Sequence, residues 1–212
     1  RDQTMVMGLG MTTEELFLGF LAKADDPGSG GRQLPQHYGQ KDLNIVSQSS
    51  PTGTQYLQAV GTAMATRQTD KNAIVYVSSG EGTTSQGEFH EALNWAGREK
   101  LPVLFHIEDN GFAISVPKSS QTAEGSVYDM VGGYGNLNRF ETDGTDFFDS
   151  FTTFKEAISS IRAGKGPAIV VSNVVRLLPH SSSDDHRKYR DADELSEEQK
   201  RDPIEKFRAQ CE

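Results

Sequence analysis

Residues 73–110 read "AIVYVSSGEGTTSQGEFHEALNWAGREKLPVLFHIEDN", and this stretch decides the fold. The apolar run 73–79 predicts a buried strand, the spacing in 87–100 predicts a helix, and 102–109 predicts the next strand. A strand, a helix and a second strand in this order form a parallel βαβ unit. The stretch therefore predicts an α/β fold built on a parallel sheet.

The rest of the chain continues the alternation of helices and strands. Helices are predicted at 12–24, at 49–68 after a turn, and at 147–164; a strand is predicted at 167–175, and a final helix after Pro203. Residues 110–145, which are Gly-rich, are expected to be irregular. This order favours a doubly wound, mostly parallel sheet with helices on both faces, which binds ligands at the carboxyl ends of its strands.

The chain has 212 residues, enough for one α/β domain with a sizeable core. We expect 1–212 to form a single domain. Because it starts at Arg1 without an initiator Met, we expect it to be a piece of a longer protein. The polar segment 176–202 is expected to be mobile.

Composition excludes several classes of protein. The net charge of -9 and the pI of about 5.1 argue against a nucleic-acid partner, which needs a basic surface. One Cys excludes an internal disulfide framework and a Cys-rich zinc site. No apolar run is long enough to span a membrane, and no signal peptide is visible. We therefore expect a cytoplasmic protein.

A carboxylate and an amide follow the two strands of the βαβ unit. Glu81 comes after the first strand and Asn110 after the second, so both belong to the same edge of the sheet. Oxygen ligands of this kind suit magnesium, which usually shares its coordination with phosphate oxygens. A helix starting near Ser85 directs its N-terminus to the same place, and Gly80 and Gly82 would let a ligand approach the backbone. These residues predict a magnesium-bridged phosphate or diphosphate, with two ordinary turns as the alternative.

The stretch from "GEGTTSQ" to "EDNGFAIS" resembles the thiamine diphosphate-binding motif, which is Gly-Asp/Glu-Gly with an Asn further along the chain. It is most similar to the α chain of the 2-oxo acid dehydrogenase decarboxylase component. Nearly the whole chain takes part, through "GGRQLPQHYG", "SSPTGTQYLQAVG", "GYG", "DGTDFF" and "HSSSDDHRKYR". Pyruvate-type relatives usually carry Asp where Glu81 stands, so the branched-chain type is favoured.

The resemblance implies a set of cofactor residues. Magnesium is held by the side chains of Glu81 and Asn110 and by the carbonyl of Phe112. The diphosphate lies against the Gly80–Thr83 turn, where Gly82 and Thr83 contact it. The further implied contacts are Arg1 and His180 to phosphate, and Ser50 and Thr52 to the aminopyrimidine ring through backbone groups.

A potassium site occurs in some members of this family. Its residues match Ser49, Pro51, Thr54 and Gln55. A Ser/Thr-rich helix start explains the same residues equally well, so both interpretations stay open.

A loop near the end of the chain has its own implied roles. His180 lines the active site, and Arg176 and Asp184 hold the loop. Ser181 matches a position that is phosphorylated in mitochondrial relatives, where an added phosphate would repel the cofactor phosphate. The chain departs from the family pattern at Glu108, which replaces an Arg near the phosphate in the mammalian branched-chain enzyme.

The resemblance implies oxidative decarboxylation of a branched-chain 2-oxo acid, with acyl transfer to the lipoyl domain of an acyltransferase. The Glu that activates the cofactor ring comes from a β subunit, or from a β half of the same polypeptide, in an α2β2-type assembly. A eukaryotic member would lie in the mitochondrial matrix, a bacterial one in the cytoplasm.

Three alternatives accompany this interpretation. A pyruvate or acetoin dehydrogenase α subunit would share the cofactor chemistry. A hydrolase built on Ser181, His180 and Asp184 lacks the Gly-x-Ser-x-Gly turn, and neighbours in sequence do not easily form a triad. A cofactor-less scaffold would need neither Glu81 nor Asn110.

Overall fold

The computed structural model describes residues 2–70 and 72–212. The chain divides into two compact units, Arg1–Gln55 and Tyr56–Glu212, where the sequence predicts a single domain. The first unit is separate because it has a small apolar core of its own. That core consists of Val6, Met11, Leu16, Tyr38 and Ile45.

The first unit contains two short helices, α1 (Gln3–Gly8) and α2 (Thr13–Phe20), and a 3-10 turn (Lys41–Leu43). Helix α2 begins with a capping box, in which Thr12 accepts from the backbone of Glu15 and the Glu15 carboxylate accepts from the backbone of Thr12. It ends at Phe20, before the predicted end, because Ala22 adopts a left-handed φ of 51° that a helix cannot continue through.

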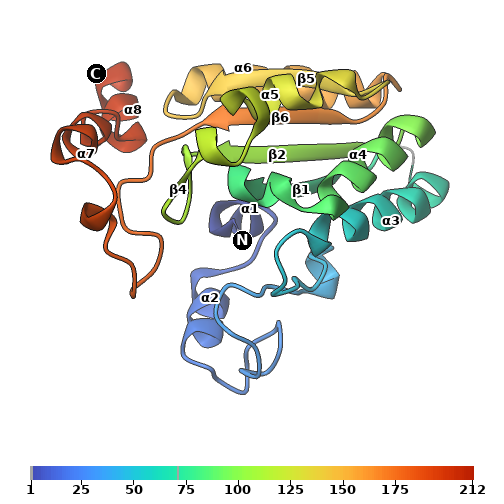
Figure 1. Ribbon diagram of the computed structural model, residues 1–212. Helices are drawn as coiled ribbons and strands as arrows, with labels where there is room; N and C mark the ends of the chain where they lie inside the picture. The colour runs from blue at the N-terminus through green and yellow to red at the C-terminus, as the bar shows by residue number, and fades with distance from the viewer. Residues whose placement is uncertain (1, 71) are drawn as a thin grey trace. The chain divides into compact units, whose positions relative to one another are not determined.

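The second unit is built on a four-stranded sheet in the order β1-β2-β6-β5, and every pairing is parallel. Figure 1 shows these strands from β5 at the top to β1 at the bottom. The elements are β1 (Val75–Gly80), α4 (Gly87–Glu99), β2 (Val103–Asp109), β5 (Asn138–Asp143), α6 (Phe147–Arg162) and β6 (Ala168–Asn173), with α3 (Thr54–Thr69) before them. The predicted parallel α/β fold is confirmed.

Helices cover both faces of this sheet. One face carries Phe105 and Ile107 of β2 and packs against α4 through Phe89 and Leu93. The opposite face carries Leu104, which packs in one cluster with Ala157 and Ile161 of α6. Since successive strand residues point to opposite faces, the apolar residues of β2 contribute to both cores.

The second unit also contains elements that the sequence did not predict. Strand β5 and the short helix α5 (Val127–Met130) lie in the segment expected to be irregular. A short antiparallel hairpin follows β2, and it is formed by the two-residue strands β3 (Phe112–Ala113) and β4 (Val116–Pro117). Further 3-10 turns span Glu81–Ser85, Lys118–Ser120, Ala123–Gly125, Val131–Gly133 and His186–Lys188.

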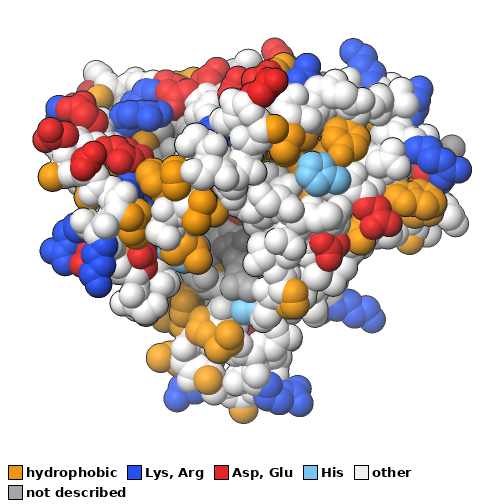
Figure 2. Space-filling view, viewed as in Figure 1, with side chains coloured by type: hydrophobic (Ala, Val, Ile, Leu, Met, Phe, Trp, Pro, Cys, Tyr) orange, Lys and Arg blue, Asp and Glu red, His pale blue; other side chains and the backbone are white. Residues whose placement is uncertain are grey.

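The last two helices are α7 (Ala192–Gln199) and α8 (Pro203–Cys211). The sequence predicts α8, which begins at Pro203, but it does not predict α7. Charged side chains of both signs gather over this region at the upper left of Figure 2. Helix α8 packs against the start of α6, with the rings of Phe207 and Phe147 4.7 Å apart. Among the described residues, no helix is both long and apolar enough to span a bilayer.

An ion pair holds α8 to the end of β5, and its strength should depend on pH. Lys206 Nζ lies 2.9 Å from Asp143. Partial burial acts to raise the pKa of Asp143, but hydrogen bonds from Thr145 and Lys206 lower this pKa to about 2. A carboxylate whose pKa is lowered in the folded state stabilises the fold at pH values above its unfolded pKa. This stability is lost as the pH falls through the folded-state pKa of about 2. We expect hydrogen exchange in α8 to accelerate over this range before exchange in β1 does; equal acceleration in both elements would contradict the assignment.

Candidate metal centre

Glu81 is placed at the carboxyl end of β1 and is completely buried. A 3-10 turn (Glu81–Ser85) follows the strand, and α4 begins at Gly87, two residues later than the predicted helix start near Ser85. The Thr84 hydroxyl donates to the Glu81 carbonyl over 2.7 Å. The turn therefore fixes the backbone that carries the carboxylate.

Hydrogen bonds join the three predicted magnesium ligands to one another. Strands β1 and β2 are in register from Val75 opposite Val103 to Gly80 opposite Glu108, so their carboxyl ends are level. The Asn110 N–H donates to Glu81 Oε2 over 3.3 Å, and the Phe112 N–H donates to Asn110 Oδ1 over 3.1 Å. Two groups far apart in sequence are thus neighbours at one sheet edge.

The second carboxylate oxygen of Glu81 has no hydrogen-bond partner among residues 2–70 and 72–212. Oε1 is buried and accepts no hydrogen bond from any described residue. Burial raises the pKa of Glu81, and the charge of Asp109 adds to this, while the hydrogen bond from Asn110 and the charge of Lys118 oppose it. A buried, unpaired carboxylate oxygen costs free energy unless a cation or donor meets it. A bound metal ion would supply that partner.

The backbone carbonyl of Phe112 is suited to the same ion. The Lys118 N–H donates to the Gly111 carbonyl, so the next pair, Phe112 with Pro117, is a non-hydrogen-bonded pair, and the Phe112 carbonyl points away from β4. A carboxylate, an amide oxygen and a carbonyl form an all-oxygen set, which magnesium prefers. The residues present therefore fit magnesium.

The two glycines of the Gly-Glu-Gly turn differ in how much space a side chain would have. A Cβ on Gly80 would meet only the Glu108 carbonyl at 3.8 Å, an ordinary contact. A Cβ on Gly82 would lie 2.6 Å from Cβ of Ala113 and 3.2 Å from its Cα. Gly82 is thus required by the packing of its turn against β3, a reason that the sequence interpretation, which invoked ligand approach, did not include.

Gly82→Ala is accordingly expected to push β3 away from the turn and to destabilise the chain by about 1–3 kcal/mol, the usual cost of overpacking. Thermal unfolding measures the change. Gly87→Ala is the matched control, because a Cβ there meets nothing within 4 Å. Equal melting temperatures for the two variants would contradict the packing argument.

The predicted loop residues form a second connected set. Arg176 donates 2.8 Å hydrogen bonds to the Tyr189 hydroxyl and to the carbonyl of Ile114 in the β3–β4 hairpin. Asp184 Oδ2 accepts from the Tyr189 hydroxyl at 2.7 Å and from the His180 N–H at 2.9 Å. The loop that carries His180 is therefore tied to the hairpin that carries Phe112.

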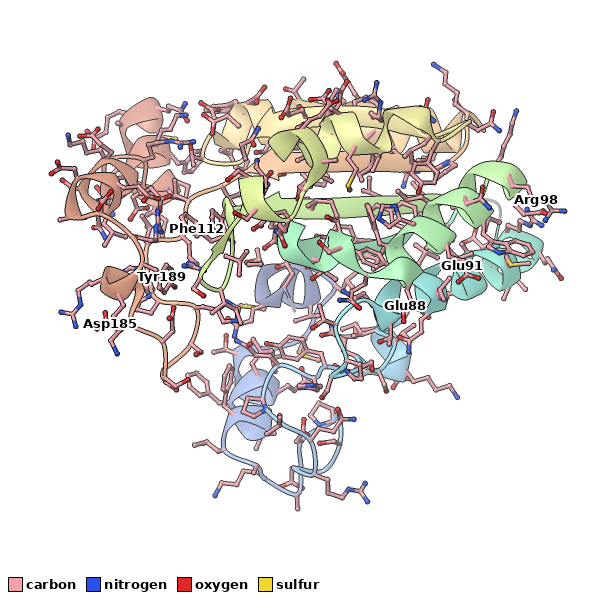
Figure 3. All side chains as sticks on the ribbon, viewed as in Figure 1. Glu88, Glu91, Arg98, Phe112, Asp185 and Tyr189 are labelled. Atoms are coloured by element: carbon pink, nitrogen blue, oxygen red, sulfur yellow. The ribbon has the colours of Figure 1, made fainter. Side chains whose placement is uncertain are left out.

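Arg190 was not singled out from the sequence, and it lies under this loop. Its side chain is fully buried and pairs with Glu198 at 2.6 Å and Glu194 at 2.7 Å. Its guanidinium lies 4.8 Å from the centre of the Phe112 ring, and that of Arg176 lies 5.6 Å from it. Figure 3 shows Phe112 near Tyr189 at this end of the unit. The spacing of Arg190, Glu194 and Glu198 on a helical repeat was the available signal.

Ser181 is exposed, and its hydroxyl lies 3.2 Å from that of Ser183. Asp184, the acid of the hydrolase alternative, is hydrogen-bonded to Tyr189 and to the backbone of His180. It is therefore engaged in holding the loop.

Apart from Thr83, which lies in the Glu81–Ser85 turn, the remaining predicted residues belong to the first unit and are described there by themselves. Ser50 lies 2.6 Å from His37 Nε2, which is itself buried. Of the predicted potassium residues, Thr54 donates to the carbonyl of Pro51, and Gln55 accepts from the backbone of Gly53. The roles of all the predicted site residues stay predictions, and Arg1 lies outside the described residues.

A family model described as "Dehydrogenase E1 component" matches residues 1–211. The chain is 43% identical over 209 residues to the 2-oxoisovalerate dehydrogenase subunit alpha of Bacillus subtilis, covering 99% of this chain and 63% of that protein. It is 37% identical over 179 residues to the mitochondrial 2-oxoisovalerate dehydrogenase subunit alpha of Homo sapiens, covering 84% of this chain and 40% of that protein. The chain thus spans less than two thirds of the length of these relatives.

One solved structure supports the fold. A transketolase from Pichia stipitis matches 61% of this chain and 21% of its own with a TM-score of 0.51 and 22% sequence identity, a likeness that supports the fold alone. The family match, by contrast, covers all but the last residue. The chain therefore belongs to the dehydrogenase E1 component family.

Proposed function

We propose that this chain holds thiamine diphosphate through magnesium, as part of an enzyme that oxidatively decarboxylates branched-chain 2-oxo acids. The observation that carries the proposal is the hydrogen-bonded series Glu81, Asn110 and Phe112, in which one buried oxygen of Glu81 has no hydrogen-bond partner in the described part of the chain. Names of the relatives support the substrate class, because they refer to 2-oxoisovalerate and 3-methyl-2-oxobutanoate.

Each residue has a task in this proposal. Glu81 and Asn110 would hold the ion by their side chains and Phe112 by its carbonyl, so that the ion neutralises a diphosphate. When bound, thiamine diphosphate supplies the nucleophilic carbon and the electron sink that decarboxylation requires. Arg176, Tyr189 and Asp184 would hold the loop so that His180 faces the phosphate.

The whole enzyme needs partners beyond this chain. The proposal assigns the activating Glu to a β subunit or a β half of the same polypeptide, in an α2β2-type assembly. It assigns acyl transfer to a lipoyl domain of an acyltransferase. The same proposal includes a potassium ion bound by Ser49, Pro51, Thr54 and Gln55. It also includes a cytoplasmic location, or a mitochondrial one in a eukaryote.

Turnover of the complete assembly on a panel of 2-oxo acids tests the function. We expect 2-oxoisovalerate to exceed pyruvate in kcat/KM by at least tenfold, because extra methylenes in an apolar pocket are worth about 1–3 kcal/mol. Chelation of magnesium should abolish turnover with either acid. A preference for pyruvate or acetoin would mean that the chain belongs to a pyruvate or acetoin dehydrogenase instead. Turnover that a chelator leaves unchanged would contradict the role of magnesium.

A further inference from the structure

A second carboxylate lies next to the proposed metal ligands and has no task in holding the ion. Asp109 is the last residue of β2, directly before Asn110, and is 5% exposed. Its Oδ1 accepts the Gly111 N–H at 3.0 Å, and its Oδ2 lies 2.6 Å from Lys118 Nζ. Both oxygens are thus engaged, in contrast to Glu81, whose Oε1 has no partner among the described residues.

Lys118 is held where it can reach Asp109. It follows β4 directly, and its backbone N–H donates to the Gly111 carbonyl over 2.8 Å. Its own carbonyl accepts from the backbones of Gln121 and Thr122. The ammonium group therefore sits at the base of the hairpin that carries Phe112, on a backbone fixed at both sides.

The pair matters because Asp109 directly precedes Asn110, which is one of the proposed metal ligands. The Asn110 N–H donates to Glu81 Oε2 over 3.3 Å, and the Gly111 N–H donates to Asp109 Oδ1 over 3.0 Å, so consecutive amides of one turn hold the two carboxylates. Magnesium keeps few protein carboxylates, whereas calcium accepts more of them in a larger and more flexible shell. A free Asp109 would add a second carboxylate to this site and would shift it towards calcium.

We propose that Lys118 is a positioning residue of the metal centre: by pairing with Asp109 it keeps that carboxylate on the Gly111 amide, so that Glu81 is the carboxylate offered to the ion. This inference rests on the proposed function. It assigns to the Asp109–Lys118 pair the preference of the site for magnesium over calcium.

The test measures apparent affinities for magnesium and for calcium, by calorimetric metal titration of the full-length protein with its β partner in excess thiamine diphosphate. Lys118→Met should reduce the preference for magnesium at least tenfold, and Lys118→Arg should keep it within threefold. Asp109→Asn should weaken both metals at least tenfold, because an uncompensated ammonium remains. The double variant Asp109→Asn/Lys118→Met should return to within threefold of wild type.

The double variant separates this role from a merely structural one. An ion pair that only stabilised the hairpin would be lost equally in Lys118→Met and in the double variant, so equal shifts in both would overturn the inference. Unchanged preference in Lys118→Met would do the same. Should Lys118→Met fail to fold, Asp109→Asn decides, and wild-type affinity in that variant would overturn the inference.

Two controls complete the design. Lys206→Met breaks another lysine–aspartate pair, at 2.9 Å from Asp143, and should leave both affinities unchanged. Glu81→Ala should abolish binding of both metals. If Glu81→Ala binds magnesium normally, the proposed function fails; if only Lys118→Met behaves as wild type, the inference about Lys118 fails alone.

Discussion

Replacing Glu81 with glutamine is expected to stabilise the metal-free chain at neutral pH and to remove magnesium-dependent cofactor binding. Burial raises the pKa of Glu81. A carboxylate with a raised folded-state pKa stabilises below its unfolded pKa, and this contribution is lost as the pH rises through the folded value. Glu81→Gln removes the cost of ionising this buried group, so it should raise the free energy of unfolding at neutral pH.

Thermal unfolding without magnesium at about pH 7–8 checks the stability effect. For a domain of this size, about 1 kcal/mol corresponds to a rise of about 2–4 °C in melting temperature. The same variant should lose about 100-fold or more in affinity for thiamine diphosphate with magnesium, since an amide supplies no charge. Glu91→Gln, an exposed change on α4 (Figure 3), should alter neither property. A Glu81→Gln variant that is less stable, yet binds normally, would refute the assignment.

Arg190→Met is expected to release the loop that carries His180. The Arg190 guanidinium is fully buried against Glu194 and Glu198 and lies over the ring of Phe112. Arg190→Met leaves two carboxylates without their partner, but Glu194 is 40% exposed and Glu198 is 16% exposed, so we expect a loss smaller than that of a fully buried pair, which is about 3–5 kcal/mol. Because Glu194 and Glu198 belong to α7, the loss should appear first as local opening of 176–199.

Hydrogen exchange localises this effect. Amides in 176–199 should lose protection in Arg190→Met, while those of β1 and β2 keep it, and turnover should fall about tenfold or more. Arg187→Met is the matched control, because Arg187 pairs with Asp185 at the surface and its side chain is 78% exposed. Exchange that is unchanged in Arg190→Met, or equal in the two variants, would show that Arg190 does not anchor the loop.

The sheet and the central pair of ligands could be predicted from sequence because their causes are local or topological. The apolar runs around Val77 and Phe105 define strands, and parallel pairing brings the residues after them to one edge. Glu81 and Asn110 were placed at that edge on this ground, and the structure joins them by a hydrogen bond.

Other features depend on contacts between segments that no local pattern records. Ala113 leaves no room for a side chain at position 82, so a glycine stands there. The guanidinium of Arg190 lies over the ring of Phe112. In both cases the contacting residue is distant in sequence. Strand β5, with residues such as Asn138 and Glu141, lacks an apolar run, and it is a strand because it pairs with β6. The separate first unit likewise follows from a small core that unites residues from 6 to 45.

The central claim is that Glu81, Asn110 and Phe112 hold a magnesium ion that binds the cofactor diphosphate. Calorimetric titration of thiamine diphosphate into the complete assembly, with magnesium and with a chelator, tests it most directly when wild type and Glu81→Ala are compared. The account predicts strong binding only for wild type with magnesium, and no resolvable binding for Glu81→Ala in either condition. Equal, magnesium-dependent binding by both proteins would contradict it.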